Sequence, residues 1–107
     1  MEIKDTCVIL LEKATQKTKC YKFKSSELGR DLALHEDSED KNHSSVTDIV
    51  TGLRLFGINQ KVKDVKEDTL NSNLEKFIRH YSLEMIVKKL ADEEKVPMEE
   101  KFKKKVK

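Results

Sequence analysis

The sequence predicts a mainly α-helical single domain, and three observations support this fold class. The chain has 107 residues, enough for one modest hydrophobic core. Charged residues make up 39% of the chain and hydrophobic residues 36%, while there are only 3 Gly and 1 Pro, a composition that suits helices better than sheets. The stretch 44–58 also carries a helix start signal, an apolar stripe and a stop signal in that order.

The stretch SSVTDIVTGLRLFGI is the element around which the predicted fold is organised. Ser45 stands at an N-cap position, and Asp48, three residues later, completes the spacing of a capping box. Apolar residues recur at helical spacing, namely Val46, Ile49, Val50, Leu53 and Phe56. Gly57 then supplies the left-handed residue that commonly ends a helix. We therefore expect a short helix whose outer face is rich in hydroxyl groups.

Before this element the pattern predicts two more helices and one short extended segment. The first helix follows an N-cap at Asp5, and its apolar stripe consists of Cys7, Val8, Leu10, Leu11 and Ala14. Tyr21 and Phe23 alternate with lysines, which indicates a very short strand or extended segment with both rings inward. Residues 25–26 open the next helix, which runs to about His35.

Two irregular segments flank the organising helix. Residues 36–43, EDSEDKNH, contain no apolar residue and predict an exposed loop. Between residues 58 and 71 the apolar positions are widely separated, which is compatible with a ragged hairpin, a pair of short strands or an irregular arm.

A long last helix is expected from Ser72, whose capping-box partner is Glu75, to about Glu94. Its first apolar stripe comprises Leu74, Phe77, Ile78 and Tyr81. A second, rotated stripe comprises Leu83, Ile86, Val87 and Leu90. This surface exceeds what three short helices cover, so either the helix pairs with a second copy of itself at one end or the domain is more compact than this arrangement; we favour the pairing. The residues assigned to that homodimer interface are Leu74, Phe77, Ile78, Tyr81 and Met85.

Charge and cysteine content restrict the class of protein only loosely. The formal net charge of +2 is too small to indicate a nucleic-acid or membrane partner by itself. The last seven residues hold five lysines and no acid, which suits either a phosphate contact or a solubilising tail. Without a signal peptide or membrane span, the chain is expected in the cytoplasm. Cys7 and Cys20 are consistent with reduced thiols, and a disulfide between them remains open.

No pattern in the sequence indicates catalysis, a metal or a cofactor. The cysteines and the histidines His35 and His43 lack the short spacing of a zinc site. The sequence contains no glycine-rich phosphate loop, no H-E-x-x-H and no G-x-S-x-G. We therefore expect a protein that is not an enzyme.

The order of these elements resembles the winged helix-turn-helix domains of bacterial and archaeal transcription regulators. The likeness is carried by KFKSSELGRDL at residues 22–32 and by SSVTDIVTGLRLFGI at residues 44–58. The resemblance implies a winged-helix-like three-helix core with a minimal β element over residues 1–71. A long C-terminal helix over residues 72–95 and a basic tail over residues 96–107 would follow.

In that family the third helix enters the major groove of double-stranded DNA, and the wing meets the adjacent backbone. The hydroxyl groups that would face bases or phosphates are those of Ser44, Ser45, Thr47 and Thr51. The residues that would contact the DNA backbone are Lys22, Lys24, Ser26, Arg54, Lys61 and Lys63.

Two functions from different classes therefore compete. The first is a dimeric DNA-binding transcription regulator that reads the major groove with helix 44–57. The second is a protein–protein interaction module without nucleic-acid binding, which uses the apolar surface of the last helix. We expect the first, because the order of the flanking elements agrees with it, although the near-neutral charge and the acidic loop 36–43 favour the second.

Overall fold

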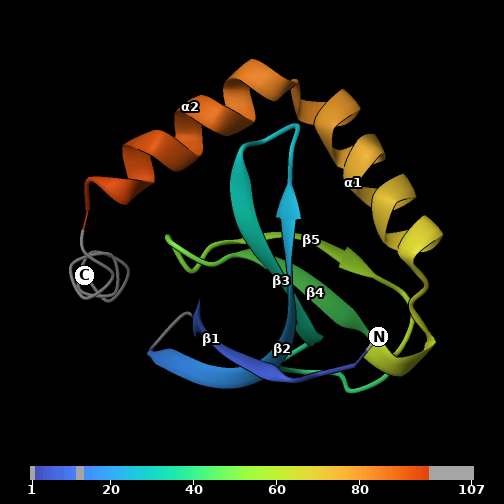
Figure 1. Ribbon diagram of the computed structural model, residues 1–107. Coiled ribbons are helices and arrows are strands. Elements are labelled where there is room, and N and C mark those ends of the chain that lie inside the picture. Colours follow the sequence, from blue (N-terminus) through green and yellow to red (C-terminus); the bar gives the residue numbers. More distant parts are fainter. Residues whose placement is uncertain (1, 12–13, 97–107) are drawn as a thin grey trace.

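The computed structural model describes residues 2–11 and 14–96, and it contains a five-stranded antiparallel sheet followed by two α-helices (Figure 1). Strands hold 37% of the described residues and helices 32%. The expectation of a mainly α-helical, winged-helix-like fold is therefore wrong.

The strands follow one another in space in the order in which they occur along the chain. They are β1 (Asp5–Leu10), β2 (Thr15–Ser25), β3 (Arg30–Glu36), β4 (Ser44–Asp48) and β5 (Arg54–Ile58). A 3₁₀ turn, η1 (Val62–Asp64), leads into α1 (Glu67–Tyr81) and α2 (Leu83–Glu94). Every strand pairing is antiparallel, so the sheet is a simple meander.

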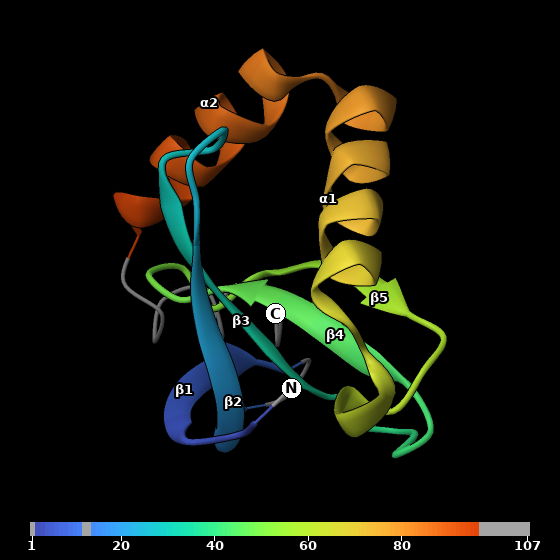
Figure 2. The same ribbon diagram turned by 45° about the vertical axis from the view of Figure 1, so that its right-hand side comes forward.

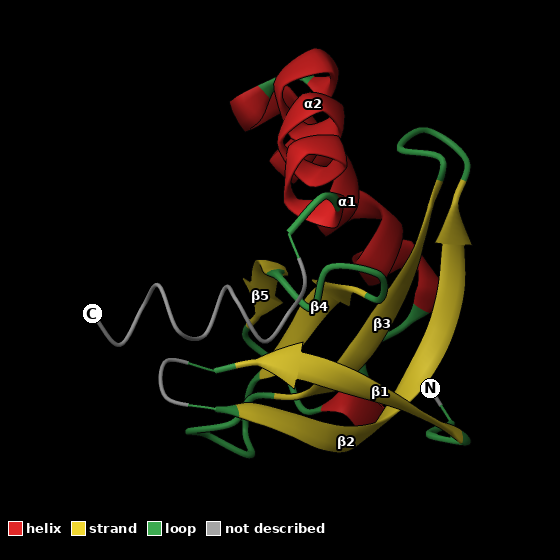
Figure 3. Ribbon diagram, turned by 90° about the vertical axis from the view of Figure 1, so that its left-hand side faces the viewer, coloured by secondary structure: helices red, strands yellow, loops and turns green. Residues whose placement is uncertain are grey.

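Strand β2 is long enough to belong to two pairings. Its residues 15–20 pair with β1, and its residues 21–25 pair with β3. The strand curves between these halves, so that β1 and the start of β2 lie across one face of the sheet (Figure 3). A small cluster fills the space there and consists of Cys7, Ile9, Cys20 and Ala33.

The other face of the sheet carries the main hydrophobic core. In β3, Leu32 and Leu34 belong to this core, whereas the intervening Ala33 belongs to the smaller cluster behind the sheet. Helices α1 and α2 form an inverted V over the face that bears Leu32 and Leu34 (Figures 1 and 2). Each helix contributes buried leucines to the core, Leu74 from α1 and Leu90 from α2.

The predicted helix over 44–57 is absent, and the stretch forms β4, a tight turn and β5 instead. All five residues of β4 are buried, and the strand lies between β3 and β5. The turn contains Gly52 at φ 75°, a conformation that few other residues adopt. Of the hydroxyl-bearing residues interpreted as an exposed helix face, Ser44, Ser45 and Thr47 are buried in β4 and Thr51 is buried in the turn. Gly57 lies within β5 rather than at a helix end.

Four further elements differ from expectation. The stripe after Asp5 is strand β1, and the segment 25–35 is a turn followed by β3. The irregular arm contains η1 and the first turn of α1, which begins at Glu67 rather than at Ser72. The long last helix is divided at Ser82 into α1 and α2. Residues 97–107, which hold most of the predicted basic tail, lie outside the described residues.

Candidate functional site

A solvent-open groove of about 370 Å³ lies between β5 and the two helices. Its lining is Leu53, Arg54, Leu55, Phe77, Tyr81, Met85, Ile86, Lys89 and Leu90. Seven of these nine side chains are apolar or aromatic and two are cationic. Within this described lining there is no acidic side chain.

The two helices supply a rigid base for the groove. Ile86 and Leu90 are buried members of the main core and form its inner part. Phe77 contacts both Phe56 of β5 and Tyr81, with ring centroids 5.3 Å and 5.2 Å apart respectively. Such tilted aromatic contacts hold the rings in defined positions. The groove is therefore formed before any partner arrives.

Large apolar side chains are exposed around the groove. Among its lining residues, Tyr81 is 50% exposed and Met85 is 65% exposed, whereas Leu83 and Val87 are also exposed but do not line it. These four residues fall within seven consecutive positions at the junction of α1 and α2. A single exposed apolar residue needs no explanation, but a cluster beside an apolar groove is typical of an interaction surface.

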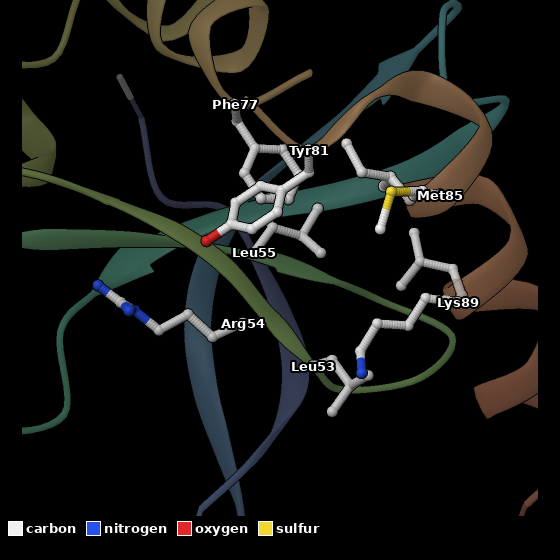
Figure 4. A pocket seen from close by; sticks show the side chains of 9 residues that line it. Leu53, Arg54, Leu55, Phe77, Tyr81, Met85 and Lys89 are labelled. Carbon is white, nitrogen blue, oxygen red and sulfur yellow. The ribbon is translucent and has the colours of Figure 1, made fainter. Parts of the chain in front are cut away.

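The two cations at the groove are oriented differently. Figure 4 shows the guanidinium group of Arg54 directed away from the apolar side chains, while the chain of Lys89 extends toward Leu53. Arg54 donates from Nε to the Ser45 hydroxyl at 3.0 Å, and it lies over Gly57, where a larger residue would meet its guanidinium. Lys89 is therefore the cation available to a bound partner.

A buried ion pair between Arg30 and Asp48 also connects the sheet to the C-terminal end of α2. Arg30 donates to both carboxylate oxygens of Asp48, at 3.0 Å and 2.8 Å, and also to Glu94 at the end of α2. Thr51 donates two further hydrogen bonds to Asp48. Burial by itself raises the pKa of Asp48, but the hydrogen bonds from Arg30 and Thr51 outweigh it, so the pKa is lower than usual.

The hydroxyl groups expected at DNA bases are all engaged inside the protein, and the recognition-helix interpretation is wrong. Ser44 donates to the Gln60 carbonyl at 2.9 Å, and Ser45 donates to Asp37 at 3.2 Å. The Thr51 hydroxyl donates to Asp48 at 2.6 Å. Ser44, Ser45, Thr47 and Thr51 are all buried.

His35 and Thr47 have the spacing of a base and a nucleophile but lack access. Nδ1 of His35 lies 2.8 Å from the Glu36 carbonyl, which can only accept, so Nε2 accepts from the Thr47 hydroxyl at 2.7 Å. Burial lowers the pKa of His35, which keeps it neutral. Both side chains are almost fully buried, and neither lines the groove. We interpret the pair as structural.

The residues proposed as DNA-backbone contacts are exposed but do not lie together, and Arg54 borders the groove. Lys22 and Lys24 border a second hollow of about 380 Å³ together with Phe23, Asp31 and Ile49. Ser26, Lys61 and Lys63 are also exposed but do not line this hollow. DNA binding through such residues stays a prediction, although the recognition helix that motivated it does not exist.

The residues assigned to a homodimer interface separate into two sets. Leu74 is buried in the main core, and Phe77 and Ile78 pack against that core. Tyr81 and Met85 are exposed at the groove. Phe77 also lines the groove, so Phe77, Tyr81 and Met85 remain available to a partner there. Leu53, Leu55 and Lys89 line the groove but are not among the predicted site residues, and the first two belong to the stretch predicted as a helix that is absent.

The described residues give two results on metals and membranes. No three or more His, Cys, Asp or Glu side chains among them are grouped to hold a metal ion. None of their helices has the length and apolar character required to cross a membrane.

Cys7 and Cys20 are free, buried and hydrogen-bonded to each other, and burial raises the pKa of Cys7 to about 12.

No protein-family model, curated protein or solved structure matches this chain.

Proposed function

We propose that this protein is a protein-interaction module that binds an apolar, carboxylate-bearing segment of another protein in the groove beside β5. The observation that carries this proposal is the groove lining, which combines seven apolar or aromatic side chains with two cations. A carboxylate on the partner would complement the charge of Lys89.

The exposed residues at the groove are of the types that contribute most to binding. Aromatic residues and methionine are enriched in interface cores, and tyrosines are frequent among the residues whose truncation costs most affinity. Tyr81 and Met85 are such residues, and they adjoin a hollow whose volume is within the usual range for binding sites. Their exposure in the free chain leaves apolar surface that a partner would cover.

A peptide selection tests this proposal. Random peptides displayed on phage would be selected against the folded wild-type chain, and the enriched peptides would be synthesised and measured by fluorescence anisotropy. We expect the selected peptides to share apolar residues and an acid. Met85→Glu should weaken their binding by about tenfold or more, because it places a carboxylate in the apolar lining.

Val50→Glu is the matched control. Val50 is 58% exposed, which is similar to Met85, but it lies in the turn between β4 and β5 and does not line the groove. This variant should bind the peptides as well as the wild type does. Peptides that bind both variants equally, or a failure to enrich any peptide, would overturn the proposal.

A further inference from the structure

We infer that the groove receives its partner as an extended strand, which pairs with the free edge of β5 and becomes a sixth strand of the sheet. This inference rests on the proposed function and specifies the form of the partner. Adding a strand to an exposed sheet edge is a common mode of peptide recognition, because backbone hydrogen bonds supply affinity and side-chain pockets supply specificity.

The position of β5 is the first argument. Within residues 2–11 and 14–96, β5 pairs with β4 alone and forms one edge of the sheet. Figure 3 shows β5 as the outermost strand on its side of the sheet. Alternate residues of an edge strand direct backbone N–H and C=O groups away from the sheet, where another strand can pair with them.

The lining of the groove is the second argument. Arg54 and Leu55 of β5 both border it, as does Leu53, which directly precedes the strand. The hollow therefore follows the chain into the start of β5. A chain in the groove would run alongside the β5 backbone.

A β-bulge at Leu55 interrupts the pairing of β5 with β4 beside the groove. The pairing of β4 with β5 passes from Val46 opposite Phe56 to Thr47 opposite Arg54, so Leu55 has no opposite residue in β4. A bulge re-aims the side chain of its extra residue and strengthens the local twist. Leu55 lies beneath Phe77 and Tyr81 in the groove (Figure 4).

The side chains define what the added strand would carry. Its alternate residues would face the helices, where Tyr81 and Met85 present exposed apolar surface. One acidic residue on the same side would meet Lys89. The occupant is thus an extended segment of another protein with alternating apolar residues and at least one carboxylate.

The test uses the peptides selected against the wild-type chain. Each backbone nitrogen of one such peptide is methylated in turn, which removes one hydrogen-bond donor without changing its side chain. A strand added to β5 uses every second N–H group for pairing, so binding should weaken strongly at alternate positions and little at the positions between them. Amide hydrogen exchange in β5 should also slow when the peptide is bound.

The outcomes separate this inference from the function on which it rests. If the peptides bind and depend on Met85, but methylation shows no alternation and exchange in β5 is unchanged, the strand inference is overturned while the proposed function stands. A loss at nearly every interior position would indicate a helical peptide instead. Reversible self-association that Met85→Glu blocks and Val50→Glu leaves intact would assign the groove to a second copy of the chain and overturn both proposals.

Discussion

Asp48 is the residue at which three distant segments of the chain meet. Its carboxylate accepts hydrogen bonds from Arg30 at the start of β3 and from Thr51 in the next turn, and Arg30 also contacts Glu94 in α2. Because its pKa is lowered in the folded state, Asp48 contributes stability above its usual pKa of about 4, and this contribution is lost as the pH falls through the folded value. A residue interpreted from sequence as a helix cap is therefore a buried ionic anchor.

Replacing Arg30 should be strongly destabilising. Arg30→Leu would leave Asp48, whose side chain is 0% exposed, without its charged partner. An uncompensated buried charge costs about 3–5 kcal/mol. We expect urea denaturation to show a loss of this size in the free energy of unfolding.

Arg79→Leu serves as the comparison for this prediction. Arg79 pairs with Glu75 on the surface of α1, where both side chains are mostly exposed. Exposed pairs of this kind contribute roughly 0–1 kcal/mol. Equal losses in the two variants would show that the buried pair has no special role.

Ser82 determines how the helical part of the chain is divided. Its φ of 74° and ψ of 143° end α1, and its side chain then accepts a hydrogen bond from the backbone N–H of Met85 at the start of α2. A serine in this region of φ and ψ is strained. The turn at Ser82 brings the second apolar stripe onto the sheet, where Ile86 and Leu90 are buried.

Substitutions at Ser82 should separate backbone strain from capping. Ser82→Gly relieves the strain and loses only a few tenths of a kcal/mol as a cap, so we expect a variant at least as stable as the wild type. Ser82→Ala keeps the strain and loses the cap, which should cost about 1 kcal/mol. Thermal unfolding followed by circular dichroism gives the order, and an alanine variant more stable than the glycine variant would refute this explanation.

Sequence reasoning succeeded where a local pattern was sufficient. The inward aromatic alternation of Tyr21 and Phe23 was correct, although β2 is much longer than the very short strand expected. The prediction of a loop between β3 and β4 was also correct, and so was the prediction of helix over most of 72–94. The expected single helix is, however, divided at Ser82 into α1 and α2.

The prediction failed where tertiary context decides between helix and strand. The apolar residues of 44–58 occur at helical spacing, but β-branched residues are frequent there, and strands accommodate those well. In β4 every residue is buried, so the alternation that reveals a half-exposed strand is absent from its sequence. The groove could not be found because its walls come from β5 and from helices that follow it in the chain.

At the scale of the whole molecule, the charge is nearly balanced. The formal net charge is +2, and the lysines of β2 lie near acids such as Asp31, which borders the same hollow as Lys22 and Lys24. Interspersed acids reduce the local positive potential that attracts phosphates. The electrostatic potential of the whole molecule therefore gives little support to tight binding of nucleic acid.

We therefore expect weak or undetectable binding of random-sequence duplex DNA in fluorescence anisotropy at about 50 mM salt. The experiment uses the full chain and is repeated at about 200 mM salt. An affinity that is measurable at low salt and falls by orders of magnitude at high salt would indicate several phosphate contacts. That result would contradict this expectation and favour the DNA-binding prediction over the interaction module.

The order of the strands also has a consequence for the growing polypeptide. Each strand pairs with the one made just before it, so the meander from β1 to β5 can assemble while later residues are still being synthesised. The side chains of Leu34 and Val46 nevertheless stay uncovered until α1 and α2 have been made, because the last part of the chain supplies their cover. A nascent chain that ends at Ile58 therefore presents a bare apolar sheet face, which makes that stage of synthesis the one most in need of a chaperone.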